Sequence, residues 1–143
     1  MANVALTYGG YYFSTPALTT LSAATPLKAA GTTTAKAVNG FTHTASNRLT
    51  YNGTVTRDFM VTVTFSANTA AGAETCSFHL YKNGSLVTGS TIVRKVSNND
   101  IGAGALSTIV ELATNDYVEL WVETLGGDDL TISNGTVIAA VVG

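Results

Sequence analysis

The stretch from Arg48 to Ser66, RLTYNGTVTRDFMVTVTFS, constrains the fold more than any other part of the chain. From Phe59 to Phe65 the odd positions are apolar, whereas the even positions are threonine apart from Met60. Side chains of a strand alternate between its two faces, so this pattern predicts a strand with one buried face and one polar face. A helix would need apolar residues three and four positions apart, which this stretch does not have.

The dipeptide Asn52-Gly53 interrupts this pattern before the long strand. Asn-Gly favours a tight two-residue turn, because glycine accepts positive φ and asparagine tolerates it. We therefore predict a hairpin in which this dipeptide connects a short strand to the long one. Arg57 lies in the apolar row, so we expect it to mark the rim at which the long strand begins, with the core running from Phe59 to Phe65.

Similar alternating segments follow toward the C-terminus, separated by turn residues such as Lys82-Asn83-Gly84-Ser85. No segment has the periodicity of a helix. Two short strands are expected around Ser133-Asn134-Gly135, and the second is apolar on both faces, which is typical of a strand buried on both sides. The predicted strands in this part of the chain lie at 74–81, 86–87, 91–96, 105–112, 117–123 and 136–142. This spacing of strands predicts an all-β sandwich or jelly roll.

A chain of 143 residues fits one domain with a hydrophobic core, so we expect a single domain at 1–143. Residues 1–25 are expected to form an N-terminal arm or edge strands, since prolines such as Pro16 suit edge strands rather than central ones. A dense aromatic triplet in this segment belongs to the core, to a contact between copies or to a docking surface. The triplet consists of Tyr11, Tyr12 and Phe13.

Composition limits the kinds of partner. Charged residues make up only 11% of the chain, well under the usual quarter, which favours burial of its surface against neighbouring copies. The net charge is −2, and the basic residues are scattered, so no basic stripe exists to neutralise a nucleic-acid backbone. No apolar run approaches the length that spans a bilayer. We therefore expect protein partners, and neither nucleic acid nor a membrane.

Few residues are suited to catalysis. The histidines His43 and His79 lie in different strand segments, and His79 is on the opposite face of its strand from Cys76, which disfavours a Cys–His pair there. The Gly-x-Ser-x-Gly motif and the glycine-rich phosphate-binding motifs are absent. Cys76 has no second cysteine to pair with and is expected to be buried as a small apolar residue. We expect neither enzymatic activity nor a cofactor.

Two loops are rich in side-chain oxygens, at 98–100 and at Asp128-Asp129. Calcium accepts such ligands, but neither loop has the spacing of an EF-hand, and Asn and Asp also favour turns for backbone reasons. We interpret both loops as turns and predict no metal site. Three Asn-Gly triplets that formally match glycosylation acceptors are interpreted as turns too; they begin at Asn52, Asn83 and Asn134.

The strand at 117–123 has an informative outward row. Tyr117, Glu119, Trp121 and Glu123 lie on the face opposite to its core residues. Aromatic side chains on such a face are typical of a subunit interface or a ligand platform. The alternative is that the N-terminal segment covers this face, and the sequence leaves both interpretations open.

Three motifs carry a resemblance to a known group: LTYNGTVTRDF at 49–59, FHLYKNGSLV at 78–87 and NDYVELWVE at 115–123. Together they resemble the trimeric jelly-roll domains of the tumour necrosis factor (TNF) and complement globular-head type, in the version common in tailed-bacteriophage virion proteins. The resemblance covers about two thirds of the chain, from Arg48 onward, and does not extend to residues 1–47. It implies a TNF-like jelly-roll sandwich of about ten antiparallel strands that forms a homotrimer around an apolar and aromatic axis.

The resemblance also implies a role in the virion. Because no collagen-like stalk or fibre repeat precedes the domain, it favours a capsid decoration (cement) protein that bridges capsomers on the outer shell and contacts the major capsid protein. The chain shows no signal peptide, so we expect synthesis in the host cytoplasm and residence on the capsid surface. The residues expected at the trimer core or interface are Tyr117, Leu120, Trp121, Val122, Val137 and Val141. Those expected to contact the capsid are Tyr11, Tyr12 and Phe13.

The main alternative is a receptor- or glycan-binding knob of a tail or head fibre. Its contact surface would comprise Tyr117 and Trp121, or the loops at 97–104 and 125–129. A secreted signalling domain is disfavoured, because the chain lacks both a signal peptide and disulfides.

Overall fold

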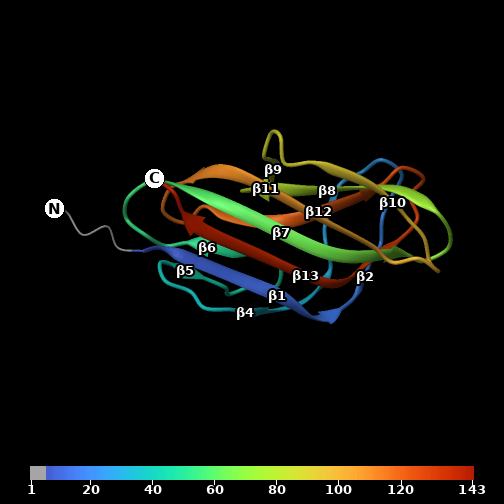
Figure 1. Ribbon diagram of the computed structural model, residues 1–143, viewed down its shortest axis with the longest axis horizontal. Coiled ribbons are helices and arrows are strands. Elements are labelled where there is room, and N and C mark those ends of the chain that lie inside the picture. Colours follow the sequence, from blue (N-terminus) through green and yellow to red (C-terminus); the bar gives the residue numbers. More distant parts are fainter. Residues whose placement is uncertain (1–5) are drawn as a thin grey trace.

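The computed structural model describes residues 6–143, which form two antiparallel sheets packed face to face (Figure 1). Every regular element in this range is a strand, which confirms the predicted all-β class. The strands are β1 (Tyr8–Pro16), β2 (Leu18–Thr19), β3 (Leu27–Lys28), β4 (Gly31–Ala35), β5 (Phe41–Thr42), β6 (Leu49–Tyr51), β7 (Arg57–Thr69), β8 (Glu74–Lys82), β9 (Ser85–Leu86), β10 (Ile92–Val96), β11 (Gly102–Leu112), β12 (Tyr117–Thr124) and β13 (Leu130–Val141).

The first sheet has the order β11-β7-β13-β1-β4, with β2 beside β13. The second has the order β10-β8-β12-β6-β5, with β3 beside β12 and β9 beside β8. From β6 onward most connections cross from one sheet to the other, which produces the jelly-roll arrangement. In Figure 1 the first sheet faces the viewer, with β11 at its upper edge and β4 at its lower edge.

The long strand β7 follows the predicted alternation. It begins at Arg57, and Phe59, Val61, Val63 and Phe65 are buried against the second sheet. The intervening side chains point to the outer face of the first sheet. Between the sheets, Phe65 stacks on Phe78 of β8 with ring centroids 3.9 Å apart. The core therefore lies between the two sheets, where each large side chain contributes about 1.5–3 kcal/mol through burial.

The predicted hairpin at Asn52-Gly53 is wrong. The strands on either side of it, β6 and β7, belong to different sheets, so the segment between them carries the chain across the sandwich. Neither residue of the dipeptide has the positive φ that a two-residue hairpin turn requires. The Tyr51 hydroxyl instead donates a 2.6 Å hydrogen bond to the carbonyl of Val55, which holds this crossing segment against β6.

The Asn83-Gly84 turn, in contrast, is a hairpin turn. Both residues have positive φ, of 51° and 81°, and they connect β8 to the short strand β9. This is the geometry that Asn-Gly favours when its flanking strands pair in one sheet. The same dipeptide therefore takes different conformations according to which strands it connects.

The end of the chain forms one strand rather than two. β13 runs without interruption from Leu130 to Val141, and its register shifts between Ile132 and Asn134, which is a β-bulge inside a continuous strand. The expectation that this strand is buried on both faces is also wrong. Val137 is buried, whereas Ile138 is 42% exposed, because nothing in the described chain covers the outer face of the first sheet.

The N-terminal segment is more central than its prolines indicate. β1 lies between β13 and β4 inside the first sheet, and Pro16 is its last residue, just after a register shift. Of the N-terminal strands in this sheet, only the short strands β2 and β4 lie at its periphery. The part of the expected arm at residues 1–5 lies outside the described residues.

Candidate functional site

The side chains expected at the trimer core lie in three different environments. Leu120, Val122 and Val137 are fully buried between the two sheets of one chain, so they have no free surface for another copy. Val141, at the end of β13, is half-buried and packs against the same core. Tyr117 and Trp121 lie on the outer face of the second sheet. The sequence pattern identified the apolar rows, but it did not reveal which of them face the core of the same chain.

Aromatic rings on the outer face of the second sheet contact one another and their charged neighbours. Trp121 stacks on Tyr81 of β8, with ring centroids 4.0 Å apart and parallel planes. The Arg48 guanidinium lies 3.9 Å above the ring of Tyr117, a cation–π contact. His79 meets Tyr81 edge-on at 6.0 Å. The faces of these rings therefore contact other side chains of the same chain, which leaves less ring surface for a ligand to stack on.

A buried carboxylate lies beneath these rings. Glu119 is only 2% exposed, and a buried charge is stable only when it is paired. Its carboxylate accepts hydrogen bonds from Arg48 Nε at 2.8 Å and Trp121 Nε1 at 3.0 Å, and it lies 3.3 Å from Lys28 Nζ. Lys28 belongs to β3 of the N-terminal segment, which pairs with β12 within the second sheet rather than lying over its outer face.

His79 is the least satisfied polar residue of this face. The residue is 6% exposed; Nδ1 lies 2.8 Å from Thr91 Oγ1, whereas Nε2 has no hydrogen-bond partner among residues 6–143. Glu123 Oε1 is 3.9 Å from Nε2, too far for a hydrogen bond. Burial lowers the pKa of His79, and the negative charge of Glu123 opposes this shift only in part. The Thr91 hydroxyl, the His79 imidazole and the Glu123 carboxylate thus lie in a row in space. The hydrogen bond between imidazole and carboxylate that a catalytic triad requires is missing.

The aromatic triplet of β1 divides between the two faces of its strand. Tyr11 and Phe13 point into the core, and only Tyr12, at 40% exposure, lies on the surface. Alternation along β1 requires this division, because adjacent side chains of a strand cannot share a face. Of the three expected capsid contacts, only Tyr12 therefore has substantial surface for another protein.

A buried polar cluster that the sequence analysis missed surrounds Asn47. The Asn47 side chain accepts hydrogen bonds from the Tyr11 hydroxyl and the Leu120 amide, and it donates to the carbonyls of Ala29 and Leu120. Its φ of 53° is in the left-handed region that asparagine tolerates. Burial raises the pKa of Tyr11 well above its ordinary value. The partners of the Asn47 side chain come from three distant segments of the chain, so no local sequence pattern indicates that Asn47 connects them.

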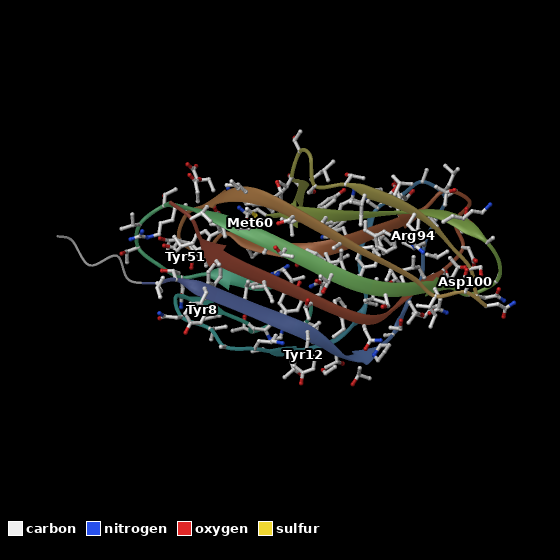
Figure 2. All side chains as sticks on the ribbon, in the orientation of Figure 1. Tyr8, Tyr12, Tyr51, Met60, Arg94 and Asp100 are labelled. Carbon is white, nitrogen blue, oxygen red and sulfur yellow. The ribbon has the colours of Figure 1, made fainter. Side chains whose placement is uncertain are left out.

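The outer face of the first sheet carries three uncharged rows, and its charged groups adjoin them: Asp58 lies opposite Glu111, and Lys36 Nζ lies 5.9 Å from the centre of the Tyr12 ring. Three rows of paired residues cross its strands, and none contains a charged side chain. Hydroxyl groups on this face satisfy one another, as Thr64 Oγ1 and Thr136 Oγ1 do at 2.6 Å. Figure 2 shows Tyr8, Tyr12 and Met60 on this sheet. The rows are Ala105–Thr64–Thr136–Tyr12–Thr34, Ser107–Thr62–Ile138–Gly10 and Ile109–Met60–Ala140–Tyr8.

The acidic loop at Asp128-Asp129 is a backbone scaffold. Asp128 Oδ2 accepts hydrogen bonds from the amides of Ala71 and Gly72, and Asp129 Oδ1 accepts one from Leu21. These bonds hold neighbouring loops together, as expected of turn-forming acids. Within residues 6–143, no group of three or more His, Cys, Asp or Glu side chains is arranged to hold a metal ion. The same range contains no helix that is long and apolar enough to cross a membrane.

Similarity to proteins of known structure extends over nearly the whole chain. Eiger TNF from S. frugiperda superimposes with a TM-score of 0.65 at 11% identity, covering 96% of this chain and 93% of the other. Murine APRIL gives 0.61 at 8% identity, covering 94% and 99%. The PRD1 vertex protein P5 gives 0.58 at 13% identity, covering 96% and 97%. No protein-family model and no curated protein matches the chain by sequence.

These matches establish a TNF-like jelly-roll fold for the chain. At such low identities, the matches show the fold and do not assign a role to any residue of this chain. The fold extends over both sheets, including the N-terminal segment in which the sequence motifs had no match.

Proposed function

We propose that the chain is a structural protein of a virion, namely a homotrimeric capsid decoration protein that stabilises neighbouring capsomers on the outer shell. The observation that carries this proposal is the set of three uncharged rows on the outer face of the first sheet. A monomeric domain normally keeps charged side chains on such a large surface. The proposed partners are two further copies of the chain and the major capsid protein.

The exposed side chains of this face support self-association. Met60, Ile109 and Ile138 are all more than a third exposed, and they lie within two adjacent rows. The hydroxyl pairs between them are satisfied within the chain, so an interface would bury them at little cost. A three-fold assembly needs a heterologous contact, in which two different parts of the surface meet, and a sheet face with two different edges offers such parts.

This assignment changes the residues proposed for the trimer interface. Tyr12 and Ile138 belong to the uncharged rows, whereas Tyr117 and Trp121 lie on the opposite face of the sandwich and would point outward from the assembly. Leu120 then supports the fold from inside the protomer. The second sheet, with its internally paired charges, is well suited to solvent.

Similarity to a vertex protein supports the location. The PRD1 vertex protein P5 shares the fold, and at 13% identity the match shows the fold alone. In the proposal the trimer sits on the outer shell of the virion and spans the junction between capsomers. The chain is synthesised in the host cytoplasm and joins the particle there.

Purified particles test the proposal. Immunogold labelling should place the protein over the whole shell, and particles that lack it should release their genome at lower temperature than complete particles. Labelling confined to the tail would contradict the proposal. If the free protein blocked host adsorption and its loss left shell stability unchanged, the chain would be a receptor-binding knob instead.

A further inference from the structure

We propose that Asn52 is a site of spontaneous deamidation in the folded protein. In this reaction the backbone nitrogen of Gly53 closes on the Asn52 side chain, ammonia leaves, and water converts the residue into aspartate or isoaspartate. The reaction needs only solvent. This inference goes beyond the proposed function and does not depend on it.

The reaction takes up water and releases ammonia. The Gly53 nitrogen loses its proton to solvent base and attacks Asn52 Cγ, the C–N bond of the side-chain amide breaks, and a succinimide ring is left. Water then attacks a ring carbonyl and breaks its bond to the Gly53 nitrogen. Attack at Cγ gives aspartate, whereas attack at the backbone carbonyl gives isoaspartate, in which the main chain runs through Cβ and Cγ. Both products carry a new negative charge.

The chain offers three Asn-Gly dipeptides for comparison, which begin at Asn52, Asn83 and Asn134. Each is followed by threonine or serine, and all three asparagines are exposed. Neither the sequence nor access to water therefore distinguishes them. What differs is the freedom of the asparagine side chain and of the next peptide, which must come together before the ring closes.

At Asn83 the side-chain amide is held at both ends. Its Nδ2 donates a 2.8 Å hydrogen bond to Asp116 Oδ1, and its Oδ1 accepts a 3.0 Å hydrogen bond from the Tyr117 amide. Cγ reaches the nitrogen of Gly84 only after these bonds break, and each lost hydrogen bond raises the barrier to ring closure. The hairpin turn therefore protects this dipeptide.

At Asn134 the backbone is held instead. The dipeptide lies inside β13, where Asn134 pairs with Ser66 and Gly135 pairs with Phe65 of β7. Gly135 is also closely packed, because a Cβ atom placed on it would lie 3.0 Å from Cδ2 of Phe13. Ring closure rotates the backbone between asparagine and glycine, so this part of the sheet would have to open first.

Asn52 has neither restraint. It lies outside the strands, in the segment that crosses the sandwich between β6 and β7. Within residues 6–143, no hydrogen bond involves the Asn52 side chain or the N–H of Gly53. The Asn52 amide carbon is therefore free to rotate toward the Gly53 nitrogen, and that nitrogen is free to lose its proton to solvent.

Tyr51 explains why glycine occupies position 53. A side chain at this position would collide with the Tyr51 hydroxyl, which is fixed by its hydrogen bond to the Val55 carbonyl. Gly53 does not have positive φ, so packing requires this glycine and a turn does not. The fold thus places the least hindered kind of backbone nitrogen directly after an unrestrained asparagine.

Isoaspartate at position 52 should loosen the crossing segment. The Asn52 amide donates a 3.0 Å hydrogen bond to the Gly40 carbonyl, and Thr114 Oγ1 donates a 2.6 Å hydrogen bond to the Gly53 carbonyl. An extra main-chain carbon between these two anchors displaces one from the other. Amides of residues 52–56 should therefore exchange hydrogen faster in the isoaspartate form than in Asn52→Asp, which has the same charge and a normal backbone. Equal exchange would overturn this consequence.

Peptide mapping of the aged full chain tests the proposal. The folded protein is incubated in mildly alkaline buffer made with heavy-oxygen water, which labels each new carboxylate, and digests are followed over time by tandem mass spectrometry. Asn52 should convert to aspartate and isoaspartate, and Asn83 and Asn134 should convert at least about tenfold more slowly. In chain unfolded with guanidinium chloride, the three asparagines should convert at similar rates, because only the fold separates them.

Asn52→Gln is the matched control, because the longer side chain closes a ring on the next nitrogen far more slowly. On ion exchange, the original chain should accumulate a more acidic form with age, and this variant should not. The proposal is overturned if Asn52 stays intact in the folded chain, or if Asn83 or Asn134 converts there as fast as Asn52. It is also overturned if Asn52→Gln accumulates the acidic form at the original rate, because the change would then lie at another residue.

Discussion

Three buried polar side chains, those of Asn47, Glu119 and His79, differ in how completely the fold satisfies them. Asn47 and Glu119 each have several partners, so their burial costs little and fixes the positions of the segments that they connect. His79 keeps one ring nitrogen without a partner. The first two residues therefore stabilise the fold, whereas His79 makes it sensitive to pH.

Replacement of Asn47 should be strongly destabilising. Asn47→Ala leaves the Tyr11 hydroxyl and the Leu120 amide without their acceptor, and we expect a loss of about 3 kcal/mol in the free energy of unfolding. Urea unfolding at fixed protein concentration, followed by circular dichroism, measures the effect. Asn134→Ala, at an exposed asparagine of β13, is the control and should change stability by less than about 0.5 kcal/mol. Similar values for the two variants would contradict the proposed role of Asn47.

Stability should fall on mild acidification because of the histidines. Burial lowers the folded-state pKa of His79 and also that of His43. Above the unfolded pKa of about 6.5, both residues are neutral in both states, and their contribution to stability is complete. As the pH falls below this value, the unfolded state takes up protons first, so stability is lost until the folded-state pKa is reached.

Unfolding measured between pH 7.5 and about pH 5 tests this expectation. His79→Gln should reduce the dependence of stability on pH, and the double variant that adds His43→Gln should reduce it further. An unchanged dependence in His79→Gln would show that the buried imidazole does not control it.

At the scale of elements, the sequence predicted strands well and connections poorly. Alternation identified β7, because a strand with one buried face must repeat every second residue. The Asn52-Gly53 hairpin failed, because the dipeptide signals a turn but not which sheets its flanking strands join. The turn before Gly135 failed for a similar reason, since a bulge and a turn have the same local composition. Which strands pair with each other depends on the whole chain, so a short stretch of sequence does not show it.

The Asp58–Glu111 pair should destabilise the junction of β7 and β11. Like charges directly opposite each other on an antiparallel pair repel, so Glu111→Gln should raise the free energy of unfolding by about 0.2–1 kcal/mol. The gain should shrink at high salt, because the pair is exposed to solvent and screened. Asp100→Asn is the control for the same change in net charge, since this exposed carboxylate has no ion-pair partner among the described residues. A gain of the same size in both variants would mean that net charge, and not the pair, sets the effect.

At the scale of the molecule, the two outer faces of the sandwich differ in kind. The face of the second sheet pairs its own charges and aromatic rings, whereas the face of the first sheet presents uncharged rows that the described chain does not cover. The motifs predicted the fold that creates these faces. They did not show which apolar residues face outward, because an apolar row of a strand fits a core and an interface equally well.

A single carboxylate placed on each face should separate assembly from folding. Ile138 lies on the proposed interface, so Ile138→Asp would bury an unpaired charge there, at a cost of several kcal/mol, and should yield a folded monomer. Val93→Asp, at a residue 63% exposed on β10, should leave the trimer intact, and Leu120→Asp should unfold the chain, because Leu120 is in the core. Light scattering and circular dichroism on all three variants distinguish these outcomes. A trimeric Ile138→Asp variant would place the interface elsewhere, and a monomeric Val93→Asp variant would place it on the second sheet.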